Sequence, residues 1–280
     1  MAAKNAVGGQ IYNDYVRAWA NEGSSLLSKE TEQMGRSADY HVHKWDAMWR
    51  KCDESKLQIK HPGGLWPDGI IPYEIEIKDF ELSSMVERAV KKFNDKITNV
   101  RWQPRAYEWS YVAFVRDDTQ NPHSNVGCIL NKQQISLCKT WPNSQGQKIL
   151  LGNILHEMGH AIGFQHTHQM PQRDDYVTVK GDMGCNSDRV NYLARAEYGF
   201  GDYDLDSIMH YPESTKIRAK VMHCGKIGQR ADFSENDLKI FNKLYEATSR
   251  ERRAREQEME RKKKAEQQKK KKPKKAEQQK

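Results

Sequence analysis

The chain has 280 residues, of which 37% are hydrophobic and 30% are charged, and its formal net charge is +8. Residues 251–280 alone contain fourteen Lys or Arg and six Glu, so this end carries the whole excess and residues 1–250 sum to zero. The length suits one large domain or two small ones, and no run of eighteen apolar residues predicts a membrane-spanning helix.

The first 64 residues are polar, with scattered aromatic side chains, and predict a helical or irregular extension without a clear core. They contain no continuous apolar stretch of the kind found in secretory signal peptides, so the sequence does not predict one. The Gly- and Pro-rich residues 61–69 predict a boundary loop. Residues 70–78 then alternate apolar and charged side chains, which predicts a half-buried strand.

A helix and further strands are predicted next. Residues 83–97 place their apolar side chains on one helical stripe, with Ser83 or Ser84 as the N-cap. The short apolar run 111–116 predicts a buried strand, and residues 126–138 predict one or two more. This order predicts helices packed on a sheet.

Residues 148–164 form the longest apolar run of helical length, which predicts a buried helix that ends at Gly163. A loop-rich region follows. The final helix is predicted over residues 234–247, where Ser234 and Asp237 make a start like a capping box. The Lys-rich residues 248–280 repeat the heptapeptide KKAEQQK. They could be transiently helical up to Pro273, but they have almost nothing to bury, so we expect them to be disordered.

The predicted buried helix carries a metal-binding pattern. His156 and His160 are four residues apart, on one helical face, and Glu157 lies beside them, as in H-E-x-x-H sites where the glutamate is a general base. Gly163 lets the chain turn, so that His166 can supply a third ligand. Three neutral histidines leave open positions on Zn²⁺ for water and substrate.

A bare H-E-x-x-H is a weak signal, because helices carry such quintets by chance. The extended pattern that includes the glycine and the third histidine is far more restrictive. With a methionine turn downstream, here around Met209, it is typical of metzincin peptidases.

The sequence resembles the astacin family of zinc metalloendopeptidases, within the metzincin clan. The resemblance runs from about Leu65 to Tyr245 and leaves both ends uncovered. Five stretches carry it, in order: LWPDGIIPYEI (65–75), HEMGHAIGFQH (156–166), QRDDYVTV (172–179), DYDLDSIMHY (202–211) and IGQRADFSENDLKIFNKLY (227–245).

The resemblance implies an α+β, metzincin-like domain over residues 65–247, with a twisted mixed sheet, an active-site helix and a loop-rich C-terminal subdomain that ends in a helix. Residues 1–64 would be an extension or prosegment, and residues 248–280 a disordered tail. The implied activity is zinc-dependent hydrolysis of peptide bonds in proteins. The alternatives are a zinc-binding protein without proteolysis and a protein that binds anionic partners through its tail.

The resemblance also implies roles for single residues. His156, His160 and His166 would bind Zn²⁺, and Glu157 would be the general base. Tyr211 would be a further ligand at rest and would then donate a hydrogen bond to the oxyanion, since a phenol can do both; the alternative is an ordinary buried aromatic residue.

Three neighbouring residues match no ligand position. Met209 would support the metal site from beneath. His168 and His210 are expected to be structural or to contact the ligands. His41 and His43 are expected to be polar surface residues.

The sequence departs from the family at Thr167, where the family usually has a glutamate that ties down the new N-terminus after a prosegment is removed. We therefore hypothesise that activation does not depend on trimming to a fixed N-terminus. Cysteine usage leaves the disulfides open, because five is an odd number. Cys128 and Cys138 would form a bridge if they faced each other, and Cys185 and Cys224 are other possible partners.

The expected partners are a protein or peptide substrate and, through residues 249–280, weak and salt-dependent electrostatic binding of anionic molecules. This tail has no aromatic residues, so base stacking is not expected. The chain is expected to be a monomer that is secreted, or delivered to another cell, by a leaderless route. A cytoplasmic location is the alternative.

Overall fold

The computed structural model describes residues 64–142, 146–180, 191–194, 201–214, 216–223 and 227–276. The chain divides into two compact units, residues 1–58 and 59–280. All described residues belong to the second unit, so the predicted extension lies outside them up to residue 63.

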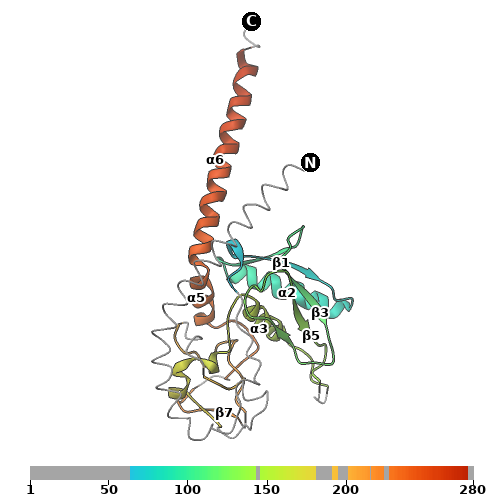
Figure 1. Ribbon diagram of the computed structural model, residues 1–280, viewed down its shortest axis with the longest axis vertical. Helices are drawn as coiled ribbons and strands as arrows, with labels where there is room; N and C mark the ends of the chain where they lie inside the picture. The colour runs from blue at the N-terminus through green and yellow to red at the C-terminus, as the bar shows by residue number, and fades with distance from the viewer. Residues whose placement is uncertain are drawn as a thin grey trace. The chain divides into compact units, whose positions relative to one another are not determined.

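A five-stranded mixed sheet lies to the right of helix α5 in Figure 1, and its strand order is β2-β1-β3-β5-β4. β1, β2, β3 and β5 are parallel, whereas the short edge strand β4 is antiparallel to β5. The expected mixed sheet is therefore confirmed, although β2 and β4 were not predicted. The strands are β1 (Ile70–Ile75), β2 (Arg101–Pro104), β3 (Tyr111–Arg116), β4 (His123–Ser124) and β5 (Lys132–Leu137).

The first long helix, α2 (Phe80–Lys96), begins three residues before the predicted start. Its N-cap is Asp79, whose carboxylate accepts a hydrogen bond from the backbone N–H of Leu82 at 3.0 Å. The predicted N-cap at Ser83 or Ser84 is therefore wrong, because both serines lie inside the helix and Asp79 caps its first turn. The predicted stripe does face the core, where Val86, Ala89, Val90 and Phe93 are buried.

The second helix, α3 (Leu151–Ala161), is buried along almost its whole length. It packs against α2, β4 and β5, and its apolar side chains join those of the sheet in one core. The chain leaves it through Gly163, whose φ of +116° is a conformation that favours glycine. The predicted buried helix and its end are thus confirmed.

The part that follows α3 is rich in loops, as expected. Within this part, the described residues contain two short 3₁₀ turns, η3 (Thr167–Gln169) and η4 (Pro171–Asp175), and a two-stranded antiparallel sheet of β6 (Val177–Val179) and β7 (Ile217–Ala219). A smaller hydrophobic cluster around this sheet holds the region together.

Helix α5 (Glu235–Leu244) has the predicted capping box. Ser234 Oγ accepts from the N–H of Asp237 at 2.9 Å, and the Asp237 carboxylate accepts from the N–H of Ser234 at 3.0 Å.

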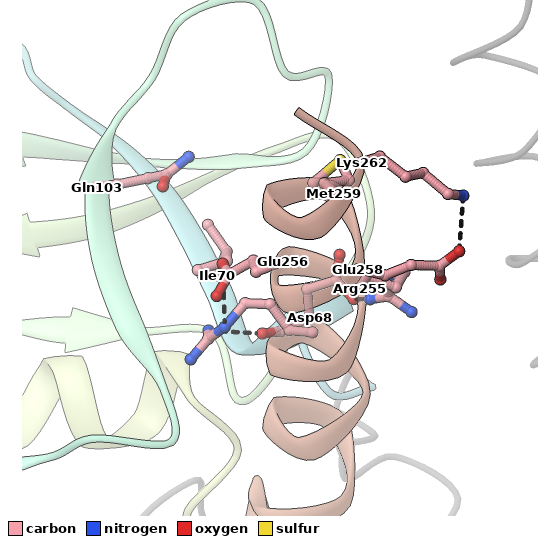
Figure 2. A pocket seen from close by; sticks show the side chains of 9 residues that line it. Asp68, Ile70, Gln103, Arg255, Glu256, Glu258, Met259 and Lys262 are labelled. Carbon is pink, nitrogen blue, oxygen red and sulfur yellow. Dashed lines mark hydrogen bonds and ion pairs between the residues drawn. The ribbon is translucent and has the colours of Figure 1, made fainter. Parts of the chain in front are cut away.

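The prediction that the Lys-rich tail is disordered is wrong for its described residues. It forms α6, which runs from Glu246 to Ala276 and extends beyond the other helices (Figure 1). Its first turns pack on the 3₁₀ turn η2 (Pro67–Gly69). Arg252 donates to the carbonyl of Asp68 at 2.8 Å, and Arg255 pairs with the Asp68 carboxylate (Figure 2).

Two of the five cysteines lie in the described part of the chain. Cys128 and Cys138 are both buried free thiols, so the possible bridge between them is wrong. They lie at opposite ends of β5, whose six residues rise by about 3.3 Å each, whereas a disulfide needs Cα atoms within about 7 Å. The remaining cysteines lie outside the described residues.

No helix in the described ranges combines the length and apolar character needed to cross a membrane.

Candidate metal centre

Three imidazoles converge below the sheet. His156 and His160 project from successive turns of α3, and the turn at Gly163 brings His166 back toward them. The Nε2 atom of His166 lies 3.3 Å from Nε2 of His156 and 3.0 Å from Nε2 of His160. These three residues form the only such cluster of possible metal ligands among the described residues.

The other ring nitrogen of each histidine is held by an oxygen acceptor. Nδ1 of His156 lies 2.7 Å from the carbonyl of Ile208, and Nδ1 of His160 lies 2.7 Å from that of Phe164. His166 Nδ1 is 3.3 Å from the side-chain oxygen of Gln169. A carbonyl only accepts, so each Nδ1 carries the proton and each Nε2 offers a lone pair to the common centre.

Burial keeps these rings neutral. Loss of hydration lowers the pKa of His160 to about 4 and holds the pKa values of His156 and His166 well below their usual range. Three neutral nitrogen lone pairs that point at one another without a proton between them form a donor set for a cation.

The spacing fits zinc. Zn–N bonds of about 2.0–2.1 Å in a tetrahedral site place ligand nitrogens about 3.3 Å apart, and the observed separations are close to this value. The cluster therefore fits a zinc site with three protein ligands, the number that leaves a position for water.

Glu157 follows His156 on α3 and is 5% exposed. Burial raises the pKa of its carboxyl to about 8, and the positive charge of Arg230 opposes this shift. Arg230 is itself partly buried, and this loss of hydration lowers its pKa to about 10; its guanidinium donates to the carbonyls of His210, Gly228 and Gln229. The sequence analysis did not single out Arg230, since an arginine in a loop gives no sign of burial.

Tyr211 lies beside the histidine cluster. Its ring centroid is 4.2 Å from that of His166, so all five residues predicted for the site lie in one region of the structure. His168 and His210 are both fully buried, in agreement with the structural role expected for them. The pair His41 and His43 lies outside the described residues.

The turn around Met209 is tied to helix α5. Asp237 accepts hydrogen bonds from Ser207 Oγ at 2.7 Å and from the N–H of Ile208 at 2.8 Å. Ser207 in turn accepts from the hydroxyl of Thr167 at 3.1 Å. Asp237 was predicted only as a helix cap, whereas it also holds the turn under the site.

Comparisons with known proteins agree with this geometry. The family described as Astacin, a peptidase family, matches residues 58–246. Astacin-like metalloprotease toxin 2 of Loxosceles intermedia is 29% identical over 67% of this chain and 75% of its own length. Tolloid-like protein 1 of Mus musculus is 34% identical, but the match covers 65% of this chain and only 19% of that protein.

A solved structure shares the fold. High choriolytic enzyme 1, a hatching enzyme zinc-protease from Oryzias latipes, superimposes with a TM-score of 0.54 and 27% identity. The match covers 70% of this chain and 98% of that enzyme.

Proposed function

This chain belongs to the astacin family of peptidases and is a metalloendopeptidase, and we propose that it hydrolyses peptide bonds at a zinc site held by His156, His160 and His166. Glu157 is the general base of this proposal. The observation that carries it is the convergence of three unprotonated Nε2 atoms on one point, with a buried carboxyl on the next position of the same helix.

Zinc bound at this cluster would lower the pKa of a water molecule and polarise the substrate carbonyl. The chain's own residues then move the protons. Glu157 takes the proton from the attacking water and passes it to the leaving amine. Its carboxyl must be ionised to do so, and both the guanidinium of Arg230 and a nearby dication lower its pKa from the value that burial alone would set.

Tyr211 is proposed to donate a hydrogen bond to the oxyanion that forms when water attacks the carbonyl. Its position against His166 supports this role, because the ring borders the cluster. Thr167 binds Ser207 and so lies in a closed hydrogen-bond network, which supports the proposal that activation does not need a charged N-terminus at this position.

The test is Glu157→Gln in the full chain, with Glu87→Gln on the exposed face of α2 as the matched control. Zinc content should be one ion per chain in all three proteins. Cleavage of casein should fall by about 10² to 10⁴ in Glu157→Gln alone, the usual contribution of a general base.

Two outcomes would count against the proposal. Unchanged cleavage by Glu157→Gln would remove the general base. A wild-type chain that holds zinc but cleaves no protein, both at full length and when begun at Leu65, would favour a zinc-binding protein without proteolysis.

We also propose that the protein acts outside the cell that makes it, which the name of the toxin relative supports. The leaderless route stays a prediction.

A second role is proposed for the distal half of α6. Residues 261–276 carry ten Lys or Arg and one Glu, whereas residues 246–260 carry four Arg and five Glu. The packed half is thus nearly neutral and the projecting half is strongly basic, which supports electrostatic binding of a polyanion.

A further inference from the structure

The Tyr211 ring contacts two histidine rings, which also lie near each other with their centroids 5.3 Å apart. The centroid of His166 is 4.2 Å away at an interplanar angle of 58°, and that of His168 is also 4.2 Å away at 29°, which is a stacked arrangement. The ring of Tyr192 meets Tyr211 edge-on at 5.7 Å. The phenol therefore contacts both a proposed metal ligand, His166, and a residue with no proposed catalytic or metal-binding role, His168.

His168 is fixed in place more firmly than a surface residue would be. It is fully buried, and its Nε2 donates to the carbonyl of Asn191 at 2.7 Å. Its own carbonyl accepts from Arg173, whose guanidinium also donates to the carbonyl of Tyr192. Arg173 thus hydrogen-bonds to the backbone of both His168 and Tyr192, whose rings contact Tyr211.

His168 is not placed to be a ligand. The three converging nitrogens belong to the other histidines, and the Nε2 of His168 is turned away into its bond with a carbonyl. Nδ1 of His168 has no hydrogen-bond partner among the described residues. Burying an unpaired polar atom is costly. A leucine or phenylalanine would fill the same space without this cost, so packing alone does not explain a histidine here.

We propose that His168 is a positioning residue for Tyr211. The face of its ring stacks on the phenol and sets the orientation of the Tyr211 ring beside His166, and the Asn191 carbonyl fixes the plane of the His168 ring. This inference rests on the proposed function, because it assigns His168 a task only if the Tyr211 hydroxyl works at the metal. Stacking is the essential part, and the hydrogen bond sets its angle.

Two substitutions separate these parts. His168→Phe keeps a flat ring in the stack but loses the bond to Asn191. His168→Gln keeps an N–H donor for that carbonyl but loses the ring. Phe93→Leu, in the core between the helix and the sheet, is the control for a general loss of stability, since Phe93 is buried and packs on Trp102 and Phe233.

The readout is spectroscopic as well as kinetic. The full-length chain is freed of zinc and loaded with Cu²⁺, and absorption from phenolate-to-copper charge transfer is recorded. Tyr211→Phe identifies the part of the band that belongs to Tyr211. Melting temperature is measured for every variant, and casein cleavage is measured with zinc bound.

We expect the band to persist in His168→Phe and to fall by about half or more in His168→Gln. In His168→Gln we also expect kcat to drop by about tenfold to a hundredfold with little change in KM, because a misplaced group loses transition-state contacts more than substrate binding. Phe93→Leu should keep the band and kcat even if its melting temperature falls as far as that of His168→Gln.

Three results would overturn the inference. They are a wild-type band that does not depend on Tyr211, a full band and full activity in His168→Gln, and an equal loss of the band in Phe93→Leu. Failure of the proposed function looks different: the Tyr211 band and its dependence on His168 would be present, while the zinc-loaded wild type cleaves no protein.

Discussion

At the scale of single residues, the site depends on positions where a side chain is absent as much as on those where one is present. Gly159 lies on α3 between the two helical ligands. A methyl group placed on it would lie 2.4 Å from Sδ of Met209 and 3.5 Å from the ring of Phe241. Helix α3 and the turn around Met209 therefore touch at a glycine, and Met209 is 2% exposed there.

We predict that Gly159→Ala lowers the free energy of unfolding by about 1 kcal/mol. Overpacking a core costs about 1–3 kcal/mol, and the better helix propensity of alanine returns about 1 kcal/mol of this. Zinc affinity should fall too, because the added methyl group would force Met209 away from the helix that carries His156 and His160. Chemical unfolding and a zinc titration measure the two effects.

The control is a double-mutant cycle with Met209→Ala, which makes room for the added methyl group. In that background Gly159→Ala should cost nothing or be slightly stabilising. An equal cost in both backgrounds would mean that the contact with Met209 is not its source.

At the scale of elements, α6 shows where a pattern of side chains misleads. Residues 248–280 lack an apolar stripe, so the sequence predicts disorder. The segment is nonetheless made of strong helix formers such as Ala, Glu, Lys, Arg and Gln. Pairs four residues apart, Glu258 with Lys262 and Glu260 with Lys264, add support along its exposed length.

Polar contacts dock the first half of α6. Ser249 and Arg253 contact the side chain of Asn99, and Arg252 and Arg255 contact Asp68. These bonds join the first half of α6 to Asp68 in η2 and to Asn99 just before β2. A stripe of hydrophobic residues is therefore not the only way to dock a helix, and hydrophobic periodicity cannot detect this one.

We predict different outcomes for two truncations. A chain that ends at Glu260 should keep its melting temperature and casein cleavage but lose salt-sensitive retention on a heparin column, because the basic half is gone. A chain that ends at Thr248 should in addition lose about 1–3 kcal/mol of stability, since it loses several partly exposed hydrogen bonds of about 1 kcal/mol each.

If both truncated chains unfold at the same temperature as the full chain, the contacts of α6 with Asp68 and Asn99 do not stabilise the protein. The proposed polyanion role fails if the chain that ends at Glu260 is retained as strongly as the full chain.

At the scale of the whole molecule, burial of the histidines links stability to pH. The pKa values of His160 and His210 are lowered to about 4 by loss of hydration, whereas an exposed histidine in the unfolded chain takes up a proton near pH 6.5. The unfolded state therefore binds more protons below pH 6.5. Stability is present above that pH and is lost as the pH falls toward 4.

We predict that the metal-free protein loses about 2 kcal/mol of stability for each of these histidines between pH 6.5 and 5. Glu157 opposes the loss, because its raised pKa favours the folded state as the pH falls through this range. Urea unfolding of the EDTA-treated protein at several pH values measures the sum. Glu157→Gln should steepen the loss, and a flat profile in that variant would contradict the assignment of neutral, buried histidines.

The sequence by itself predicted the cluster of three histidines and much of the fold. The spacing of His156, His160 and His166 is a local property of one helix and one turn, and buried strands such as β3 show directly in runs of apolar residues. The capping box of α5 is local as well, because its two residues are three positions apart.

Only the tertiary structure decided what joins these local units. Asp237 holds the turn around Met209, Arg230 brings a partly buried charge near Glu157, and His168 lies on Tyr211, although each pair is separated by tens of residues. The free state of Cys128 and Cys138 was decided in the same way, by the length of β5 between them. Contacts between distant segments depend on how the elements pack in space, and periodicity and motif spacing report only what lies within one element.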